Sequence, residues 1–226
     1  MLLYTLAPVL TATLAAAIAA WRPPGPTLVS ALQHFTAGVV FAAAAGELLP
    51  DLKHHGLWPV VIGSAVGIAT VLLVGKLERT VKGPIGLLTT VGIDVFIDGL
   101  VLGLGFAAGQ REGFLLLIAL TLETLFLGLT VTAELGEGGS SRARTIATTA
   151  GVALLLPLGA ALAHPVGKLP PYAVTGFFAF GLMALLYLVT EELLVEAHEQ
   201  PDRPWVTAMF FIGFLLLLIL EDLIGG

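Results

Sequence analysis

The sequence predicts an all-α integral membrane protein whose residues 1–226 form a single domain of eight transmembrane helices. Composition is the first observation behind this prediction, because 57% of the residues are hydrophobic and only 12% are charged. A soluble domain carries about 25% charged residues. The second observation is a series of apolar segments that approach or reach the roughly 20 residues a helix needs to cross the hydrocarbon core. The mean hydropathy of +0.99 agrees with both observations.

The eight apolar segments are separated by short linkers rich in Gly, Pro or charged residues, none of which is long enough for a second folded domain. In the sixth segment Pro157 lacks a backbone N–H and is expected to kink the helix. Glycine pairs four residues apart, such as Gly63 with Gly67 and Gly99 with Gly103, fit close helix packing. The predicted spans are 2–21, 29–49, 57–75, 85–108, 114–133, 145–163, 172–193 and 205–223.

Lys and Arg are distributed unevenly between the linkers, and this predicts the orientation of the chain. With the N-terminus outside, the cytoplasmic linkers hold seven of these residues and the outer linkers hold three. The positive-inside rule therefore favours a multi-pass protein of the cytoplasmic membrane with both termini outside. Ten Lys and Arg against 16 Asp and Glu make nucleic acid an unexpected partner. The chain has no Cys, which excludes thiolate ligands. No nucleophile–base pair stands out in the sequence, so an enzyme is not expected.

Three acidic residues lie near the middle of two predicted helices. Asp94 and Asp98 are one turn apart on one face of the fourth helix, and Glu123 lies in the antiparallel fifth helix. An acid at mid-membrane costs about 2.5–3.5 kcal/mol on insertion scales, and no Lys or Arg lies inside any predicted span. Three clustered carboxylates cannot all stay ionised, so the pattern predicts a site for a metal ion or a proton. The alternative is neutral carboxyl groups bonded to the threonines at 89, 90, 121 and 124.

Two pairs of segments resemble inverted repeats. Residues 37–52 (AGVVFAAAAGELLPDL) and 180–199 (FGLMALLYLVTEELLVEAHE) both finish in Glu-Leu-Leu followed by another acid, within 46–52 and 191–197, and they end at opposite sides of the membrane. Residues 98–103 (DGLVLG) and 123–128 (ETLFLG) share the acid, the spacing and the final glycine in antiparallel helices. Inverted repeats with a polar site at the midplane are typical of secondary transporters. Chance similarity between low-complexity helices is the alternative.

Further polar residues lie along the path that such a site predicts. Glu47 is at the outer end of the second helix, and Glu191 and Glu192 are at the inner end of the seventh. His34 is the one histidine inside a predicted span, and it either completes the site or is a packed, hydrogen-bonded side chain. The histidines 54–55 in the following outer loop either capture metal or are simply solvated.

These motifs resemble those of the ZIP family, the zinc- and iron-regulated-transporter-like proteins. Residues 187–198 (YLVTEELLVEAH) are similar to the seventh-helix motif of that family. Residues 94–100 (DVFIDGL) are similar to its fourth-helix motif, His-Asn-Phe-Pro-Glu-Gly-Leu, and 123–128 to its fifth. The resemblance covers nearly the whole chain. It implies eight spans with both termini outside, and an elevator-like motion of helices one, four, five and six against the other four.

The chain also departs from that family at metal-binding positions. Asp94 and Val95 stand where the family has a metal-binding His and an Asn, and Leu156 stands where the sixth helix has a Glu. We therefore expect one metal site, with oxygen ligands from Asp94, Asp98 and Glu123, in place of a two-metal centre. Carboxylates suit Mg²⁺, Ca²⁺ and Mn²⁺, and zinc also accepts them. The resemblance makes zinc the first expectation, with manganese, iron, cobalt and cadmium after it.

The expected function is secondary transport of divalent metal toward the cytoplasm, with the metal as substrate and no prosthetic group. Two alternatives stay open: a divergent member that moves protons or another cation, and a membrane sensor that shares the fold without transporting. The expected partners are the lipid bilayer and the metal ion, with a homodimer as a further option. Metal must displace protons from any protonated carboxyl group, so some pH dependence is expected.

Overall fold

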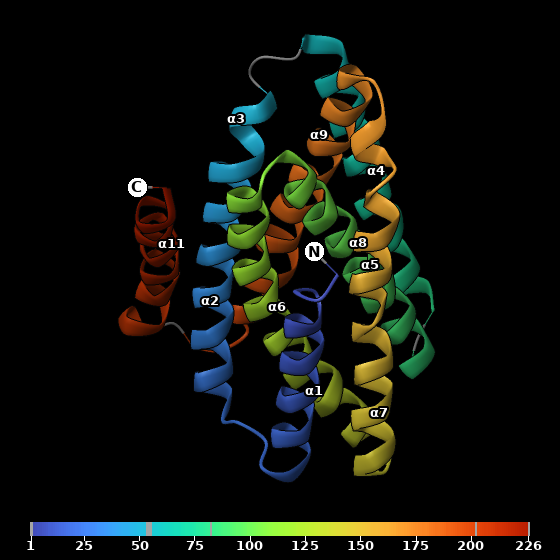
Figure 1. Ribbon diagram of the computed structural model, residues 1–226. Helices are drawn as coiled ribbons and strands as arrows, with labels where there is room; N and C mark the ends of the chain where they lie inside the picture. Colours follow the sequence, from blue (N-terminus) through green and yellow to red (C-terminus); the bar gives the residue numbers. More distant parts are fainter. Residues whose placement is uncertain (1, 53–55, 82, 202, 226) are drawn as a thin grey trace.

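The computed structural model describes residues 2–52, 56–81, 83–201 and 203–225, and nearly all of this part of the chain is helical (Figure 1). No strand occurs in these ranges, which confirms the all-α prediction. The long helices are α1 (Leu6–Trp21), α2 (Pro26–Ala43), α4 (Leu57–Thr80), α5 (Pro84–Ala108), α6 (Gln110–Glu137), α7 (Arg142–Ala153), α8 (Leu155–Ala163), α9 (Pro171–Tyr187) and α11 (Pro204–Gly225). The shorter segments are α3 (Leu49–Leu52), η2 (Val166–Lys168), α10 (Leu194–Ala197) and the π-helical η1 (Ala44–Leu48) and η3 (Leu188–Leu193).

Seven helical stretches within the described ranges are long and apolar enough to cross a membrane. The remaining predicted span, 2–21, corresponds to α1, which is apolar but has only 16 residues. At 1.5 Å per residue α1 is about 24 Å long, against a hydrocarbon core of about 30 Å. It is shorter than predicted because residues 2–5 form turns, in which the Thr5 hydroxyl donates to the Leu2 carbonyl. The seven stretches are Pro26–Leu48, Leu57–Leu77, Ile85–Ala108, Gln110–Gly136, Arg142–Lys168, Pro171–Ala197 and Pro204–Ile224.

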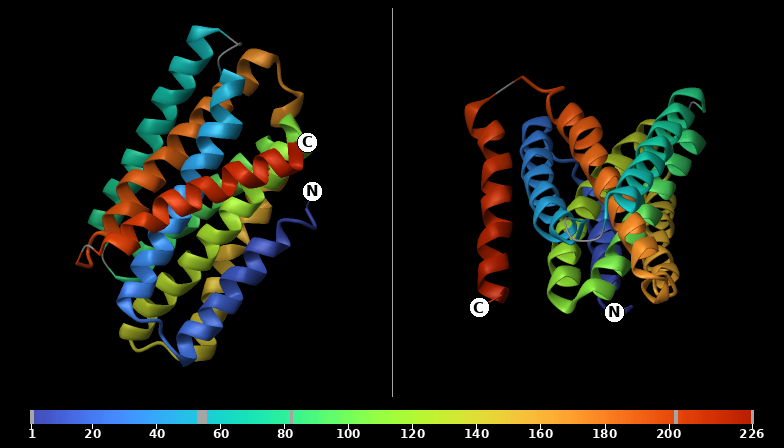
Figure 2. Two further views of the ribbon diagram at one scale, coloured as in Figure 1. Left: turned by 90° about the vertical axis from the view of Figure 1, so that its left-hand side faces the viewer. Right: turned by 90° about the horizontal axis from the view of Figure 1, so that it is seen from above.

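The helices pack as two bundles (Figures 1 and 2). In the first bundle α1 packs along α6 and α7, and α5 packs along α6 and α8. In the second bundle α2 packs along α11 and α4 packs along α9. Contacts between the bundles are made mainly by α2 with α6 and by α5 with α4 and α9.

Glycines permit the closest helix contacts, and several of these contacts lie inside a single bundle. A Cβ at Gly99 of α5 would collide with the backbone carbonyl of Leu156 in α8. A Cβ at Gly63 of α4 would collide with the carbonyl of Gly176 in α9. Small residues let helix backbones approach in a membrane, where no hydrophobic force drives association. The same applies to Gly103 against Ala160, Gly67 against Phe180, Gly128 against Ala12 and Gly38 against Phe210.

Three of the spans are interrupted, each near a residue that the sequence singles out. The break between α7 and α8 falls at Leu154, three residues before Pro157, which cannot donate to the carbonyl of Ala153. The other two interruptions are the π-helical segments, and η1 carries Glu47 whereas η3 carries Glu191 and Glu192. π-Helical turns often occur at functional sites. The two copies of the predicted repeat at 46–52 and 191–197 thus share the same unusual backbone geometry.

Candidate cation site

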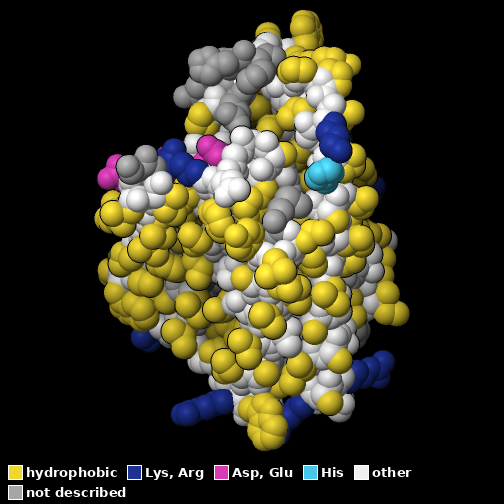
Figure 3. Space-filling model, viewed as in Figure 1, with side chains coloured by type: hydrophobic (Ala, Val, Ile, Leu, Met, Phe, Trp, Pro, Cys, Tyr) yellow, Lys and Arg dark blue, Asp and Glu magenta, His cyan; other side chains and the backbone are white. Residues whose placement is uncertain are grey.

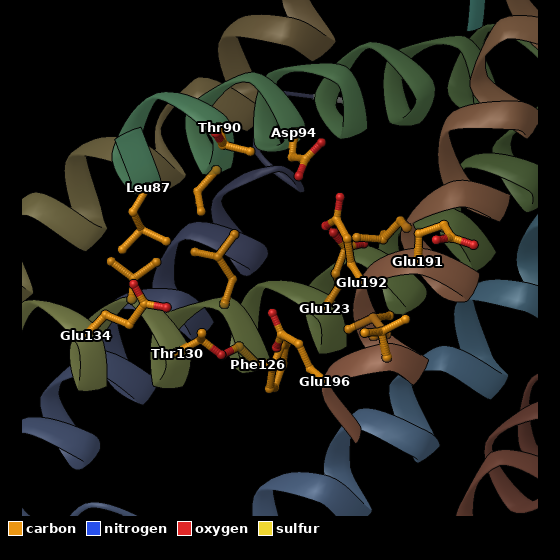
Figure 4. A pocket seen from close by; sticks show the side chains of 16 residues that line it. Leu87, Thr90, Asp94, Glu123, Phe126, Thr130, Glu134, Glu191, Glu192 and Glu196 are labelled. Carbon is orange, nitrogen blue, oxygen red and sulfur yellow. The ribbon is translucent and has the colours of Figure 1, made fainter. Parts of the chain in front are cut away.

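A cavity of about 270 Å³ lies between α5, α6 and the segment formed by η3 and α10 (Figure 4). None of the described residues that line it is Lys, Arg or His. Carboxylates gathered this closely repel one another, so they need cations or protons nearby. Six acidic residues from the three elements contribute to its wall: Asp94, Glu123, Glu134, Glu191, Glu192 and Glu196.

The α-helical period explains how one face of α6, with polar and apolar side chains, lines this cavity. Glu123, Phe126, Leu127, Thr130 and Glu134 all line it, and successive members are one, three or four residues apart. Residues three and four apart share one face of an α-helix. Glu134 follows Glu123 by 11 residues, which is close to three turns at 3.6 residues per turn. This spacing is visible in the sequence and places Glu134 on the same face of α6 as Glu123, although Glu134 is not among the predicted site residues.

On η3 two consecutive acids line the same cavity. Glu191 is exposed and Glu192 is partly buried. Figure 4 shows Glu192 pointing toward Asp94 and Glu123, whereas Glu191 lies at the edge of the group. A π-helical turn is wider than an α-helical one and changes the register of the side chains, which helps adjacent residues reach one cavity. Both adjacent acids of η3 therefore line the cavity.

Asp98 and Glu123 lie deepest, with exposed fractions of 5% and 4%. Their carboxyl groups lie close enough to share a hydrogen bond. Such a bond requires a proton on one of them, because an ionised carboxylate can only accept. The Oδ2 atom of Asp98 and the Oε2 atom of Glu123 are buried and have no hydrogen-bond partner in the described ranges. Buried polar atoms normally have partners, so these two oxygens are available to a cation or a proton donor.

The structure brings the three predicted midplane acids into one group. Asp94 lines the cavity and interacts electrostatically with both Asp98 and Glu123. Glu192 is close enough to Glu123 to interact with it in the same way. The expected meeting of α5 and α6 at this depth is thus observed, with η3 as a third contributor.

The threonines that the sequence offers as alternative partners do not bond to Asp98 or Glu123. The hydroxyls of Thr89, Thr121 and Thr124 donate to backbone carbonyl oxygens. The Thr90 hydroxyl is buried with no hydrogen-bond partner among the residues described. The alternative in which these threonines bond to the buried carboxyl pair is therefore not observed among the described residues.

Two other predicted residues lie away from the cavity. Glu47 is buried in η1, and His34 is buried in α2. The Nδ1–H of His34 donates to the Ser30 carbonyl at 2.9 Å, and its ring faces the ring of His198. The packed, hydrogen-bonded alternative for His34 is the one observed, so His34 does not join the acids. The histidines at 54 and 55 lie outside the described residues.

The acids surround the cavity without converging on one point. Over the described part of the chain, no group of three or more His, Asp or Glu side chains is arranged as a metal-binding cluster. A scan against protein-family models and a search of curated proteins both find no match for this chain. The function must therefore be inferred from the chemistry of the cavity itself.

Proposed function

We propose that the chain is a ZIP-like secondary transporter that moves a divalent metal ion across the membrane toward the cytoplasm. The observation that carries the proposal is the acidic cavity that adjoins the buried Asp98–Glu123 pair, deep inside apolar helices. Ionisable residues inside a membrane are costly and commonly mark ion pathways. Asp94, Asp98 and Glu123 would form the substrate site, with Glu192 beside them.

The direction of the cavity supports release on the cytoplasmic side. It extends from Asp94 and Glu123 toward the start of α5 at Leu87 and the end of α6 at the exposed Glu134. Figure 3 shows Lys and Arg side chains gathered at the lower end of the molecule. Under the positive-inside rule that end faces the cytoplasm. The proposed conformation is therefore open inward, with Glu191 and Glu192 near the exit and the buried Glu47 on the outer path.

The same orientation gives the proposed topology. The short α1, packed against α6, would also cross the membrane and bring the number of spans to eight. Both termini would then lie outside the cytoplasmic membrane. Asp94, Asp98 and Glu123 belong to the first bundle, whereas Glu192 belongs to the second. An elevator-like motion of one bundle against the other would therefore change the distance between Glu192 and the other acids. This change would alter the site between its outward and inward states.

The ligand chemistry supports a divalent cation bound by oxygen. Carboxylates suit Mg²⁺, Ca²⁺ and Mn²⁺, and Zn²⁺ binds them at about 2.0–2.2 Å. The family resemblance makes zinc the first candidate, followed by manganese, iron, cobalt and cadmium. Because the acids do not converge on one point, the substrate would keep part of its hydration shell.

The first test is metal flux in proteoliposomes. Zn²⁺, Mn²⁺, Fe²⁺, Co²⁺, Cd²⁺ and Mg²⁺ would be presented in turn to the wild-type chain and to Asp98→Asn. The expected result is uptake of at least one transition metal by the wild type and background flux in the variant. Asp222→Asn is the matched control, because it makes the same change at an exposed carboxylate at the end of α11 and should leave flux unchanged. Normal flux in Asp98→Asn would remove the carboxyl pair from the pathway.

Proton transport is a second candidate, and one observation favours it. The Asp98 and Glu123 carboxyl groups are close enough to share a hydrogen bond, and such a bond would hold a proton at the site. A pH-sensitive dye inside the same vesicles would report proton movement driven by a membrane potential. Proton flux without metal flux would favour this candidate. The absence of both fluxes in folded protein would favour a sensor that shares the fold.

A further inference from the structure

A second polar contact joins α2 to α10, away from the Asp98–Glu123 pair. The Ser30 hydroxyl donates to the Ala197 carbonyl at 2.7 Å, and Gln33 Nε2 donates to Glu196 Oε2 at 2.9 Å. The next residue along α2 is His34, whose ring centroid lies 4.9 Å from that of His198, with an angle of 60° between the rings. The two neighbouring hydrogen bonds hold the helices in register, so the surroundings keep the two tilted imidazole rings next to each other.

Hydrogen bonds fix the tautomer of both rings. Nδ1 of His34 is 2.9 Å from the Ser30 carbonyl, and Nδ1 of His198 is 2.6 Å from the Leu194 carbonyl. A carbonyl oxygen can only accept, so each Nδ1 carries the proton. In the neutral rings each Nε2 then carries a lone pair. Histidines that bind metals commonly donate the other ring N–H to a backbone carbonyl in this way.

The Nε2 atom of His34 is the feature that hydrogen bonding leaves unexplained. His34 is 2% exposed, and its Nε2 is buried with no hydrogen-bond partner in the described part of the chain. His198 is exposed and lines a surface groove together with Pro204, Thr207, Ala208 and Phe211. A small ligand could therefore reach the pair from the groove on the His198 side. Its chemistry must suit two imidazole lone pairs.

We propose that His34 and His198 form a second metal site, which takes a borderline divalent cation such as Cu²⁺, Ni²⁺ or Zn²⁺ through two imidazole nitrogens. Imidazole ligands suit these metals, whereas Mg²⁺ and Ca²⁺ prefer oxygen. Water from the groove completes the coordination. The described lining of the carboxylate cavity contains no histidine, so the two sites share no ligand, and Glu196 of that lining accepts the Gln33 hydrogen bond beside the histidine pair. The proposal goes beyond transport and does not depend on it.

Electron paramagnetic resonance of bound Cu²⁺ tests this site, because coupling to ¹⁴N counts the imidazole ligands directly. The background protein is the full chain with His54→Ala and His55→Ala, so that these two histidines do not contribute to the signal. One equivalent of Cu²⁺ is expected to give coupling from two imidazole nitrogens. Adding His198→Ala should remove at least one of them and weaken Cu²⁺ binding by about 10-fold or more.

The controls separate metal binding from packing. His164→Ala changes an exposed histidine elsewhere and should leave the spectrum unaltered. His34→Ala alters a buried residue and is interpreted only if gel filtration and circular dichroism match the background protein. His198→Ala is at an exposed position and keeps the test valid if that variant fails to fold. A background spectrum without nitrogen coupling, or one unchanged by His198→Ala, would show that the imidazoles only pack together.

Discussion

At the scale of single residues, the Asp98–Glu123 pair places chemistry where packing alone would favour apolar side chains. Both carboxyl groups are almost fully buried, and one oxygen of each lacks a partner among the described residues. Burying polar groups without full hydrogen bonding costs free energy. Under the proposed function this cost is offset by binding of the transported ion, and substitution should separate function from stability.

Asp98→Asn is expected to abolish flux while leaving the melting temperature unchanged or raising it. An amide donates a hydrogen bond to the Glu123 carboxylate without requiring a bound proton, and it buries no ionisable group. For a chain of this size each kcal/mol gained corresponds to a rise of about 2–4 °C. Thermal unfolding in detergent, followed by circular dichroism, measures this difference.

Asp222→Asn is again the control, because its carboxylate is exposed and its replacement should leave both melting temperature and flux unaltered. A fall of several degrees in Asp98→Asn, with Asp222→Asn unaffected, would mean that the carboxyl pair is structural. The loss of flux in that variant would then reflect a damaged fold, and the assignment of Asp98 to the site would have to be withdrawn.

At the scale of elements, glycine contacts hold the helices of each bundle together. The Gly99 contact brings α5 against the backbone of α8 directly after the α7–α8 break, and Asp98 immediately precedes it. Loss of this contact would shift α5 as a whole, because backbone atoms cannot rotate aside as a side chain can. The position of Asp98 therefore depends on a neighbour that has no side chain.

Gly99→Ala is expected to destabilise the chain by about 1–3 kcal/mol, the usual cost of overpacking. Gly151→Ala in α7 makes the same change where nothing lies within 4 Å of the new Cβ. There alanine should be neutral or stabilising by about 0.5–1 kcal/mol, because glycine is a poor helix former. Denaturant titration of both variants in the same detergent tests the difference. Equal stabilities would show that α5 and α8 are farther apart than the structure indicates.

The sequence was sufficient to predict the long helices, because their signals are local. Apolar runs and the Gly and Pro residues that follow them set most helix ends within a few residues, and Pro157 accounts for the α7–α8 break. The two π-helical segments could not be predicted in this way. A π-turn adds one residue to a turn. In a segment whose residues are mostly apolar on every face this addition leaves no mark in the sequence, so the position of the π-turn is set by packing between helices. The shorter start of α1 depends on local turns in the same sense.

The site was predictable only in its deepest part. Asp94, Asp98 and Glu123 are unusual because they are acids in the middle of apolar runs, and the structure groups them. Glu134 and Glu196 lie nearer the helix ends, where acids are common, so their presence in the cavity wall follows from helix packing. The sequence left two alternatives for His34, and the structure shows the packed one, with its ring beside that of His198.

At the scale of the whole molecule, an ion pair between Arg111 and Glu221 links the two bundles at the end opposite the acidic cavity's opening. Arg111 at the start of α6 donates to the carboxylate of Glu221 in α11 at 3.1 Å and to its backbone carbonyl at 3.3 Å. A partly exposed pair of this kind contributes only about 0–1 kcal/mol. The pair is therefore more useful as an indicator of bundle movement than as a source of stability, because an elevator-like motion of the first bundle must separate these two side chains.

A covalent link at this position should stop transport while leaving metal binding intact. The chain has no natural cysteine, so Arg111→Cys with Glu221→Cys can be joined selectively by a short bismaleimide. The linked protein would be held with its cavity open at the Glu134 end, so flux should fall to background. Metal binding, measured by equilibrium dialysis in detergent, should persist because Asp94, Asp98 and Glu123 remain accessible from that side.

The matched control is the same link within one bundle. Trp58 and Tyr172 line opposite sides of one groove between α4 and α9, which both belong to the second bundle. The control protein carries Trp58→Cys with Tyr172→Cys. Linking them should leave flux unchanged, because these helices do not move relative to each other. Full flux in the linked 111–221 protein would exclude relative motion of the two bundles, since one transport cycle would then occur with their outer ends fixed. Flux that falls only after linking, and not in the unlinked cysteine pair, would assign the loss to restricted motion of the bundles.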